Sequence, residues 1–274
     1  SSTSFSPANM QMVEVIKGIG CIARDSVQNT GTDILFLSST GLQSLGRVIQ
    51  EKSQPMRDIS KNVRDDIVGA ISASTNSAIR AIYHAEEAFY LLYFPAIRRI
   101  YCFDMRTPLQ DGSARVTVWD NQTHTNMVAN GELFFTNVDG LAQYRGYTDN
   151  GNAYRLKYYT TYFDFGNATQ FKILKRLAVT VIGGSSQDFV LKAGFDYTDS
   201  YQSFAAQLST KAISEYGEAE YNIAEYESGT LAETQRASIG GSGEVLQVGF
   251  EATVDGSALS IQKMDIFVKQ GRIF

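Results

Sequence analysis

The sequence has 274 residues, with 15 Tyr, 16 Phe and 23 Gly but only 4 Pro, and a formal net charge of −5. This length accommodates two ordinary domains, and many aromatic residues and glycines favour short strands joined by tight turns. Residues 1–150 hold 13 basic and 15 acidic groups, and residues 151–274 hold 11 and 14. Neither half therefore has the basic composition of a domain that grips nucleic acid.

The first 50 residues predict a polar arm and an antiparallel meander. Residues 1–17 begin polar and become apolar, which indicates an arm followed by a strand. Residues 18–50 contain three apolar runs of strand length, separated by turn residues at 29–31 and 39–41.

Residues 54–73 interrupt the strand pattern and predict an amphipathic helix. Pro55 suits the first helical turn, and Ser53 suits the cap before it. We expect the apolar stripe of this helix to dock on the β core. The stripe consists of Met56, Ile59, Val63, Ile67 and Ile71.

The strand pattern resumes after the helix. Residues 78–120 contain four strand-length runs, the last of which holds the only Trp, and this length and layout are typical of one propeller blade. Residues 124–147 continue in the same rhythm with three further runs. We therefore predict a propeller-like module of antiparallel blades in residues 1–150, with the helix as an insertion.

Two stretches of this first module repeat one pattern. DILFLSSTGLQSL at 33–45 and ELFFTNVDGLAQY at 132–144 align at a constant offset of 99, without a gap. The alignment pairs Gly41 with Gly140 and Leu42 with Leu141. We interpret both stretches as a hairpin whose turn ends at the glycine, which accepts φ > 0 without a Cβ clash.

The composition changes after residue 150. Residues 151–274 contain longer strand-like runs, and 183–184 (Gly-Gly) and 255–256 (Asp-Gly) are typical of hairpin turns. We predict a separate antiparallel β-sandwich or barrel in this part. The run at 240–243 reads as a flexible turn.

One acidic segment fits neither module. Residues 215–229 repeat Glu-Tyr three times at intervals of five, with glutamates at Glu215, Glu220 and Glu225. A period of five matches neither a helix nor a strand, so we predict an extended, ordered loop.

The sequence offers little catalytic or metal-binding chemistry. The two histidines, His84 and His124, stand outside metal-ligand and catalytic motifs and read as solvated loop residues. Cys21 and Cys102 form no zinc or disulfide pattern, so we expect two buried thiols. We therefore assign no catalytic, cofactor-binding or metal-binding residue, and we expect no enzymatic activity.

Charged pairs read as surface groups in the same way. Residues 65–66 (Asp-Asp) and 86–87 (Glu-Glu) are expected to be solvated. Basic residues cluster at Lys172, Lys175 and Arg176, and adjacent strand residues should point to opposite faces, so we expect only part of this cluster to form one patch.

Four stretches of strand-forming sequence follow one another along most of the chain. They read GCIARDSVQNTGTDILFLSSTGLQSL, then AIYHAEEAFYLLYF with RRIYCFDMRTPLQDGSARVTVWD, then GELFFTNVDGLAQYRGYTDNG, then YYTTYFDFGNATQFKILKRLAVTVIGG. This succession resembles the tail nozzle proteins of short-tailed bacteriophages, also called tail tubular protein B, over roughly residues 18–274.

The resemblance implies a virion structural protein located in the phage tail. It implies a homohexameric ring in the distal tail tube, in contact with tail adaptor and tail fibre proteins, around a channel through which the viral DNA leaves. The DNA would be bound weakly, without a cofactor or a small-molecule substrate. Three blades cannot close a propeller, so either more blades precede Ser1 or a neighbour completes the module.

The acidic composition is compatible with such a conduit, because each phosphate neutralised by Lys or Arg strengthens DNA binding. The glutamates Glu215, Glu220 and Glu225 would then line a channel wall or a subunit seam once copied around a symmetry axis. The alternative is a surface loop whose tyrosines pack locally.

Two other classes of function stay open. One is a receptor- or glycan-binding module at the tail tip, in which exposed Tyr and Phe stack on sugars. The other is a glycan-degrading enzyme that uses two carboxylates set apart in space.

Overall fold

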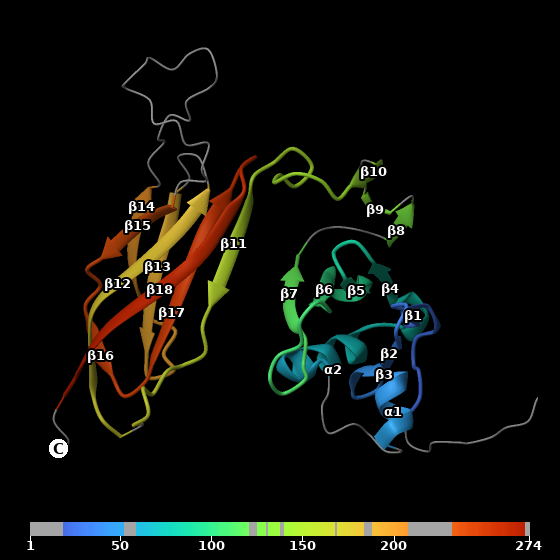
Figure 1. Cartoon of the computed structure of the whole chain (residues 1–274), viewed down its shortest axis with the longest axis horizontal. Coiled ribbons are helices and arrows are strands. Elements are labelled where there is room, and N and C mark those ends of the chain that lie inside the picture. The colour runs from blue at the N-terminus through green and yellow to red at the C-terminus, as the bar shows by residue number, and fades with distance from the viewer. Residues whose placement is uncertain are drawn as a thin grey trace, which may run out of the picture. The chain divides into compact units, whose positions relative to one another are not determined.

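The protein was analysed as a computed structural model, which describes residues 19–51, 59–120, 125–129, 131–137, 140–167, 169–183, 188–207 and 232–271. The fold is mainly β, with several antiparallel sheets and no closed barrel among the described strands (Figure 1). The chain divides into two compact units, residues 1–144 and 145–274. The arm and strand predicted in residues 1–17 lie outside the described residues.

The first unit contains three antiparallel sheets, and in each one the hydrogen-bonded neighbours are consecutive strands. The four strands predicted in residues 78–120 are confirmed as β4 to β7, which form the middle sheet. The strands are β1 (Gln28–Asn29), β2 (Ile34–Ser38) and β3 (Gly41–Ser44); β4 (Arg80–His84), β5 (Phe89–Phe94), β6 (Arg99–Asp104) and β7 (Arg115–Trp119); β8 (Thr125–Ala129), β9 (Glu132–Asn137) and β10 (Gly140–Gln143).

The central strands of the middle sheet, β5 and β6, are buried on both faces. On one face, Leu92 of β5 shares a hydrophobic cluster with Leu37 of β2. On the other face, Leu91 shares a second cluster with Leu133 of β9. The three sheets therefore form layers in chain order. A strand that is covered on both sides must be apolar at successive positions, which explains the continuous run FYLLYF of β5.

The first and third sheets contain the same hairpin. Gly41 pairs with Ser38 in β2–β3, Gly140 pairs with Asn137 in β9–β10, and the further pairs keep the same offset of 99. Gly41 and Gly140 have φ angles of +135° and +133°, a region that only glycine enters easily. The predicted repeat of the hairpin is therefore confirmed.

The predicted helix at 54–73 is shorter than expected. Helix α2 covers Arg64–Ala73, after a 3-10 turn at Lys61–Val63, and residues 59–60 form a turn. The Ser60 hydroxyl accepts the Leu42 N–H (3.0 Å) and the Ile59 carbonyl accepts the Ala114 N–H (3.0 Å). These two residues are therefore fixed by tertiary contacts, while residues 54–58 lie outside the described part of the chain.

The apolar stripe of α2 docks on the β core, as predicted, because Ile67 is buried in the cluster that also contains Leu37. An unpredicted helix, α1 (Leu45–Glu51), follows β3 directly. None of the described helices is long and apolar enough to cross a membrane. Short 3-10 turns lie at Arg24–Ser26, Asn76–Ala78 and Pro95–Ile97.

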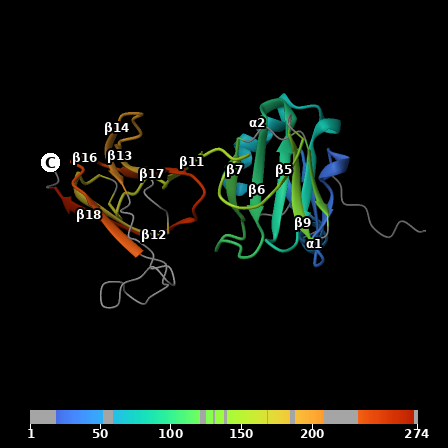
Figure 2. The same ribbon diagram turned by 90° about the horizontal axis from the view of Figure 1, so that it is seen from above.

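The second unit contains two four-stranded antiparallel sheets around one hydrophobic core (Figure 2). In one sheet the strand order is β11-β17-β13-β14; in the other, β12 pairs with β15 and β16 and also with β18. Strands β14, β15 and β16 were not predicted. The bounds are β11 (Tyr154–Tyr159), β12 (Lys172–Gly183), β13 (Asp188–Phe195), β14 (Tyr201–Gln207), β15 (Ala232–Ala237), β16 (Gly241–Gly243), β17 (Leu246–Val254) and β18 (Leu259–Gln270).

The predicted hairpin turns of this unit are wrong. Asp255 and Gly256 connect β17 to β18, which belong to different sheets, and the stretch after Gly183 leads from β12 to a strand of the other sheet. Both connections therefore cross between the layers. The glycine run at 240–243 is also no flexible turn, because Gly241–Gly243 forms β16 and pairs with β12.

Candidate functional site

The predicted acidic residues Glu215, Glu220 and Glu225 lie outside the described residues, so their place in a channel or seam stays a prediction. His124 lies outside them as well. The carboxylate pairs at 65–66 and 86–87 are exposed, as expected. In the described part of the chain, no group of three His, Cys, Asp or Glu side chains is arranged to hold a metal ion.

His84 is buried, which contradicts the solvated position expected for it. It ends β4, and its Nε2 lies 2.8 Å from the carbonyl oxygen of Gly131, at the β8–β9 turn. The imidazole is covered because the third sheet packs there against the middle one. Its Nδ1 has no hydrogen-bond partner among the described residues.

The two cysteines differ. Cys102 lies inside the middle sheet, and burial raises the pKa of its thiol to about 12, which makes the thiolate scarce at neutral pH. Cys21 is exposed, contrary to the expectation of two buried thiols. Neither residue forms a disulfide.

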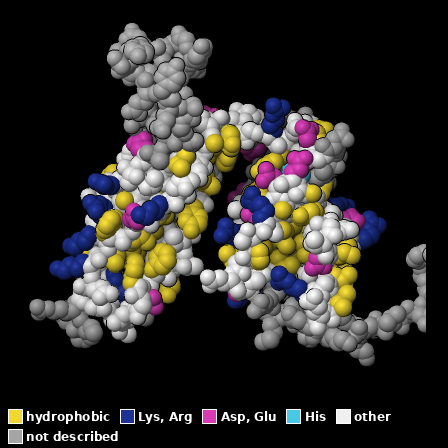
Figure 3. Space-filling view, viewed as in Figure 1, with side chains coloured by type: hydrophobic (Ala, Val, Ile, Leu, Met, Phe, Trp, Pro, Cys, Tyr) yellow, Lys and Arg dark blue, Asp and Glu magenta, His cyan; other side chains and the backbone are white. Residues whose placement is uncertain are grey.

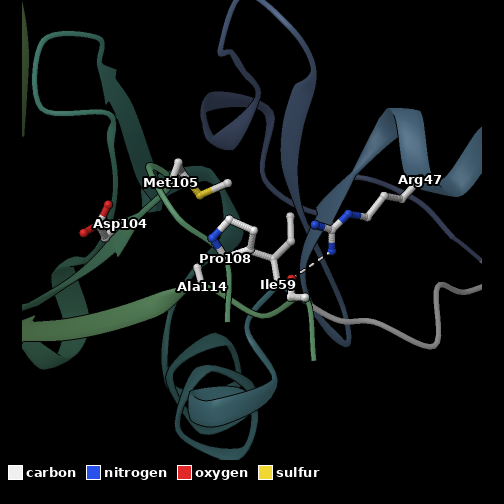
Figure 4. A pocket seen from close by; sticks show the side chains of 7 residues that line it. Arg47, Ile59, Asp104, Met105, Pro108 and Ala114 are labelled. Carbon is white, nitrogen blue, oxygen red and sulfur yellow. Dashed lines mark hydrogen bonds between the residues drawn. The ribbon is translucent and has the colours of Figure 1, made fainter. Parts of the chain in front are cut away.

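A small pocket of about 90 Å³ lies in the first unit, between α1 and the loop that precedes β7 (Figure 4). Arg47 closes one side, and its guanidinium donates to the Gly112 carbonyl (3.1 Å). The pocket is small, and the Arg47 guanidinium is engaged in holding the loop. We therefore regard this pocket as a packing feature. It is lined by Arg47, Ile59, Asp104, Met105, Pro108, Gly112 and Ala114.

The outer face of the sheet β11-β17-β13-β14 carries a cluster of tyrosine side chains and a network of charged groups. Tyr159 of β11 lies over Gly249, and Tyr201 of β14 lies over Gly194, so closely that a Cβ on either glycine would come within 2.5 and 2.7 Å of ring atoms. The two rings meet edge to face, with centroids 5.5 Å apart. The glycines thus make room for aromatic rings that lie against the sheet.

Two further tyrosines adjoin this pair. Tyr162, just after β11, packs on Tyr197 of the β13–β14 turn, with ring centroids 4.4 Å apart. Burial and a hydrogen bond with Tyr201 raise the pKa of Tyr162. We call these four residues, Tyr159, Tyr162, Tyr197 and Tyr201, the tyrosine face.

A buried carboxylate stands beside the tyrosine face. The side chain of Glu251, in β17, is only 4% exposed, and it accepts hydrogen bonds from Lys192 Nζ (2.7 Å), Arg155 and the Tyr159 hydroxyl. Burial opposes ionisation of this carboxyl, but the donors outweigh it and lower its pKa to about 2. The network therefore holds an ionised glutamate with two cations, and it fixes the Tyr159 ring.

The outer face of the other sheet is basic. Lys175 sits at a β-bulge between the pairs Leu174–Val268 and Arg176–Phe267, and both Lys175 and Arg176 are exposed. The expectation that they point to opposite faces is wrong, because the bulge adds one residue to the strand.

Further cations surround the bulge, and the nearby Lys172 is buried, where its Nζ donates to the Asn167 and Glu244 carbonyls. Figure 3 shows Lys and Arg side chains spread around a hydrophobic area of the second unit. The guanidinium of Arg176 lies over the Phe267 ring, 4.3 Å from its centroid. The even charge balance of the sequence thus conceals a local excess of positive charge. The exposed cations on this face are Lys175, Arg176, Arg236, Lys263 and Lys269.

Sequence reasoning missed the tyrosine face because its members come from separate segments that only the strand register brings together. The available signal was a glycine inside each of two strands, Gly194 and Gly249, which often marks the close approach of another group. No protein-family model matches this sequence, and no curated protein matches it.

Proposed function

We propose that this chain is a virion structural protein, a subunit of the tail nozzle through which a short-tailed phage ejects its DNA. The succession of strand motifs over residues 18–274 supports the proposal, as does the mainly β scaffold with its repeated hairpin. The subunit acts by assembly into a homohexameric ring, in contact with tail adaptor and tail fibre proteins.

The repeated hairpin carries this proposal. The two copies of the hairpin have the same register, and they pack on opposite faces of the middle sheet. Repeated sheets that pack face to face are the building principle of propellers and other repeat scaffolds. We infer that the three sheets of the first unit are propeller-like blades, and that the second unit is a β-sandwich.

The two copies differ in what covers them. Leu42 is 0% exposed, because the middle sheet packs on its face, whereas Leu141, its equivalent, is 57% exposed. The opposite face of that hairpin, with Leu133, packs on the middle sheet. We infer that a sheet of a neighbouring subunit covers Leu141, as the middle sheet covers Leu42.

Sizing by light scattering and electron microscopy of the purified chain tests the assembly. We expect a ring-shaped oligomer, and the L141E variant should associate at least about tenfold more weakly, since it loses a buried leucine worth about 1.5–3 kcal/mol. V118E, which alters an apolar residue of similar exposure (45%) on β7, serves as the control. A wild-type chain that stays monomeric at assembly concentrations would contradict the nozzle.

Charge reversal tests the acidic segment. Replacing Glu215, Glu220 and Glu225 with Lys should slow genome delivery, because added cations bind the phosphates of the passing DNA. Phage carrying the three substitutions would be compared with wild type for infectivity and for retention of packaged DNA. Unchanged values of both would exclude a role of these residues in the channel wall.

A further inference from the structure

We propose that the tyrosine face of the second unit is a carbohydrate-binding site that takes a neutral oligosaccharide of hexose units. Four tyrosine rings lie next to one another there. The Tyr201 hydroxyl donates to Gln247 Oε1 (2.5 Å), which places an amide on the same face. Sugars present apolar C–H faces to aromatic rings and hydroxyls to such polar groups, so rings with a few convergent polar groups suit them.

The backbone at Tyr197 has an unusual conformation. Residues 195–198 form a turn closed by the Thr198 N–H and the Phe195 carbonyl (3.0 Å), and Asp196 and Tyr197 have φ angles of +50° and +57°. Two successive positive φ angles are typical of a type I′ turn, in which Gly, Asn and Asp are strongly preferred. A bulky residue such as tyrosine is an outlier at this position.

Hydrogen bonds explain the conformation of Asp196, but the contacts of Tyr197 do not explain its conformation. The Asp196 carboxylate accepts the N–H groups of Glu244 (2.7 Å) and Val245 (3.2 Å), which ties the turn to the start of β17. Tyr197 is 72% exposed and packs only against Tyr162 among the aromatic rings described. A strained, exposed aromatic residue of this kind points to a role in binding.

The other rings are already held in place. Tyr159 and Tyr201 lie against glycines, and their hydroxyls are fixed by Glu251 and Gln247. Rings that cannot rotate away lose little conformational entropy when a ligand stacks on them. The face is therefore organised before any ligand arrives.

The charges near the rings favour a neutral ligand. Asp196 and Asp199 are exposed around Tyr197, and they would repel a polyanion such as DNA. At the other end, Glu251 offsets part of the charge of Arg155, Lys192 and the exposed Lys157, which pairs with Glu251 in the strand register. A polyanion would find a better match on the basic face of the other sheet.

Packing of rings on glycines is also a way to stabilise a sheet, and it accounts for Tyr159 and Tyr201 without any ligand. It does not account for Tyr197, which lies against none of the glycines that the structure describes. The variant that separates the two explanations is therefore Y197G, because glycine suits this turn and the fold should be kept.

Saturation-transfer NMR on the full chain tests the proposal, with maltohexaose, cellohexaose and chitohexaose as probes. We expect at least one of them to bind in the millimolar range, and Y197G to weaken that binding about fivefold or more while the unfolding temperature does not fall. Y158A is the matched control, since Tyr158 is 50% exposed and its neighbour Tyr159 points to the opposite face of β11.

Three results would overturn the proposal. The first is no binding of any of these probes at about 10 mM, a concentration at which weak sugar sites fill. The second is equal binding by the wild type and Y197G. The third is binding of dextran sulfate alone that Y197G abolishes, which would make the face a site for anions.

Discussion

The middle sheet of the first unit and the tyrosine-bearing sheet of the second have the same size and the same antiparallel pairing, but opposite uses. The central strands of the middle sheet, β5 and β6, are covered on both faces and are apolar at nearly every position. In the other sheet, β17 sends Val248 and Phe250 into the core and Gln247 and Glu251 to the outer face. A sheet covered on one side only keeps a face for polar networks and recognition.

The two units differ in the kind of side chain that their sheets present to their surroundings. The stability of the first unit depends on apolar contact, and even His84 is enclosed there. In the second, the outer faces hold tyrosines and a buried ion network on one sheet and exposed cations on the other. The effects of substitutions on the free energy of unfolding should therefore differ between the two sheets, both in size and in their dependence on pH.

The largest effect is expected from F103A in the middle sheet. Phe103 is fully buried, and its removal should lower the free energy of unfolding by about 3–5 kcal/mol through lost burial and the cavity left behind. Trp119, the only tryptophan, lies in the same sheet, so urea unfolding followed by its fluorescence reports on this unit. V118A, at an exposed site, should change little; a loss below about 1 kcal/mol for F103A would show that this sheet is not tightly packed.

A smaller effect is expected from E251Q in the second unit. The variant leaves Lys192 and Arg155 without their carboxylate, and it should cost about 2 kcal/mol, because Arg155 is half exposed and can be solvated. Hydrogen exchange of β17 would measure the loss locally. E233Q changes a carboxylate that is not buried and serves as the control.

The same glutamate makes the second unit sensitive to acid. Its pKa is lowered to about 2 in the fold from an ordinary value of 4.5, so its stabilising contribution is present above about pH 4.5 and is lost as the pH falls toward 2. The wild type should therefore lose more stability than E251Q over this range. Equal pH profiles would mean that folding does not lower the pKa of Glu251.

The smallest expected effect has the opposite sign. Y197G should raise the free energy of unfolding of the second unit by about 0.5–1 kcal/mol, because glycine adopts the positive φ without strain. Calorimetry would detect this as a higher unfolding temperature. A lower temperature would mean that the contact between Tyr197 and Tyr162 outweighs the strain of the turn.

Local patterns predicted the strands of the middle sheet and the repeated hairpin, because their apolar runs and turn glycines lie close together in sequence. Helix α1 escaped prediction because its start depends on a distant group: the Asp33 carboxylate accepts the Gly46 N–H (2.9 Å), and the Ser44 hydroxyl accepts the Arg47 N–H (3.2 Å). Without these contacts, residues 45–51 look like a continued strand.

The turns and the tyrosine face show a second limit of prediction from the sequence, which is the choice of partner for each strand. Asp255-Gly256 has the local chemistry of a hairpin, yet it connects two sheets, because turn residues specify the reversal of the chain and not the partner of the next strand. The tyrosine face depends on which strands are neighbours, so Tyr159 and Tyr201 could not be joined before the register was known.

The bulge at Lys175 divides β12 into two reading frames. Before it, the even-numbered Lys172 and Leu174 are buried; after it, the odd-numbered Leu177 and Val179 are. The extra residue shifts the alternation of side chains by one position, so that both ends of β12 direct apolar side chains into the core. Deletion of Lys175 would merge the frames, and half of the strand would then present its apolar side chains to water.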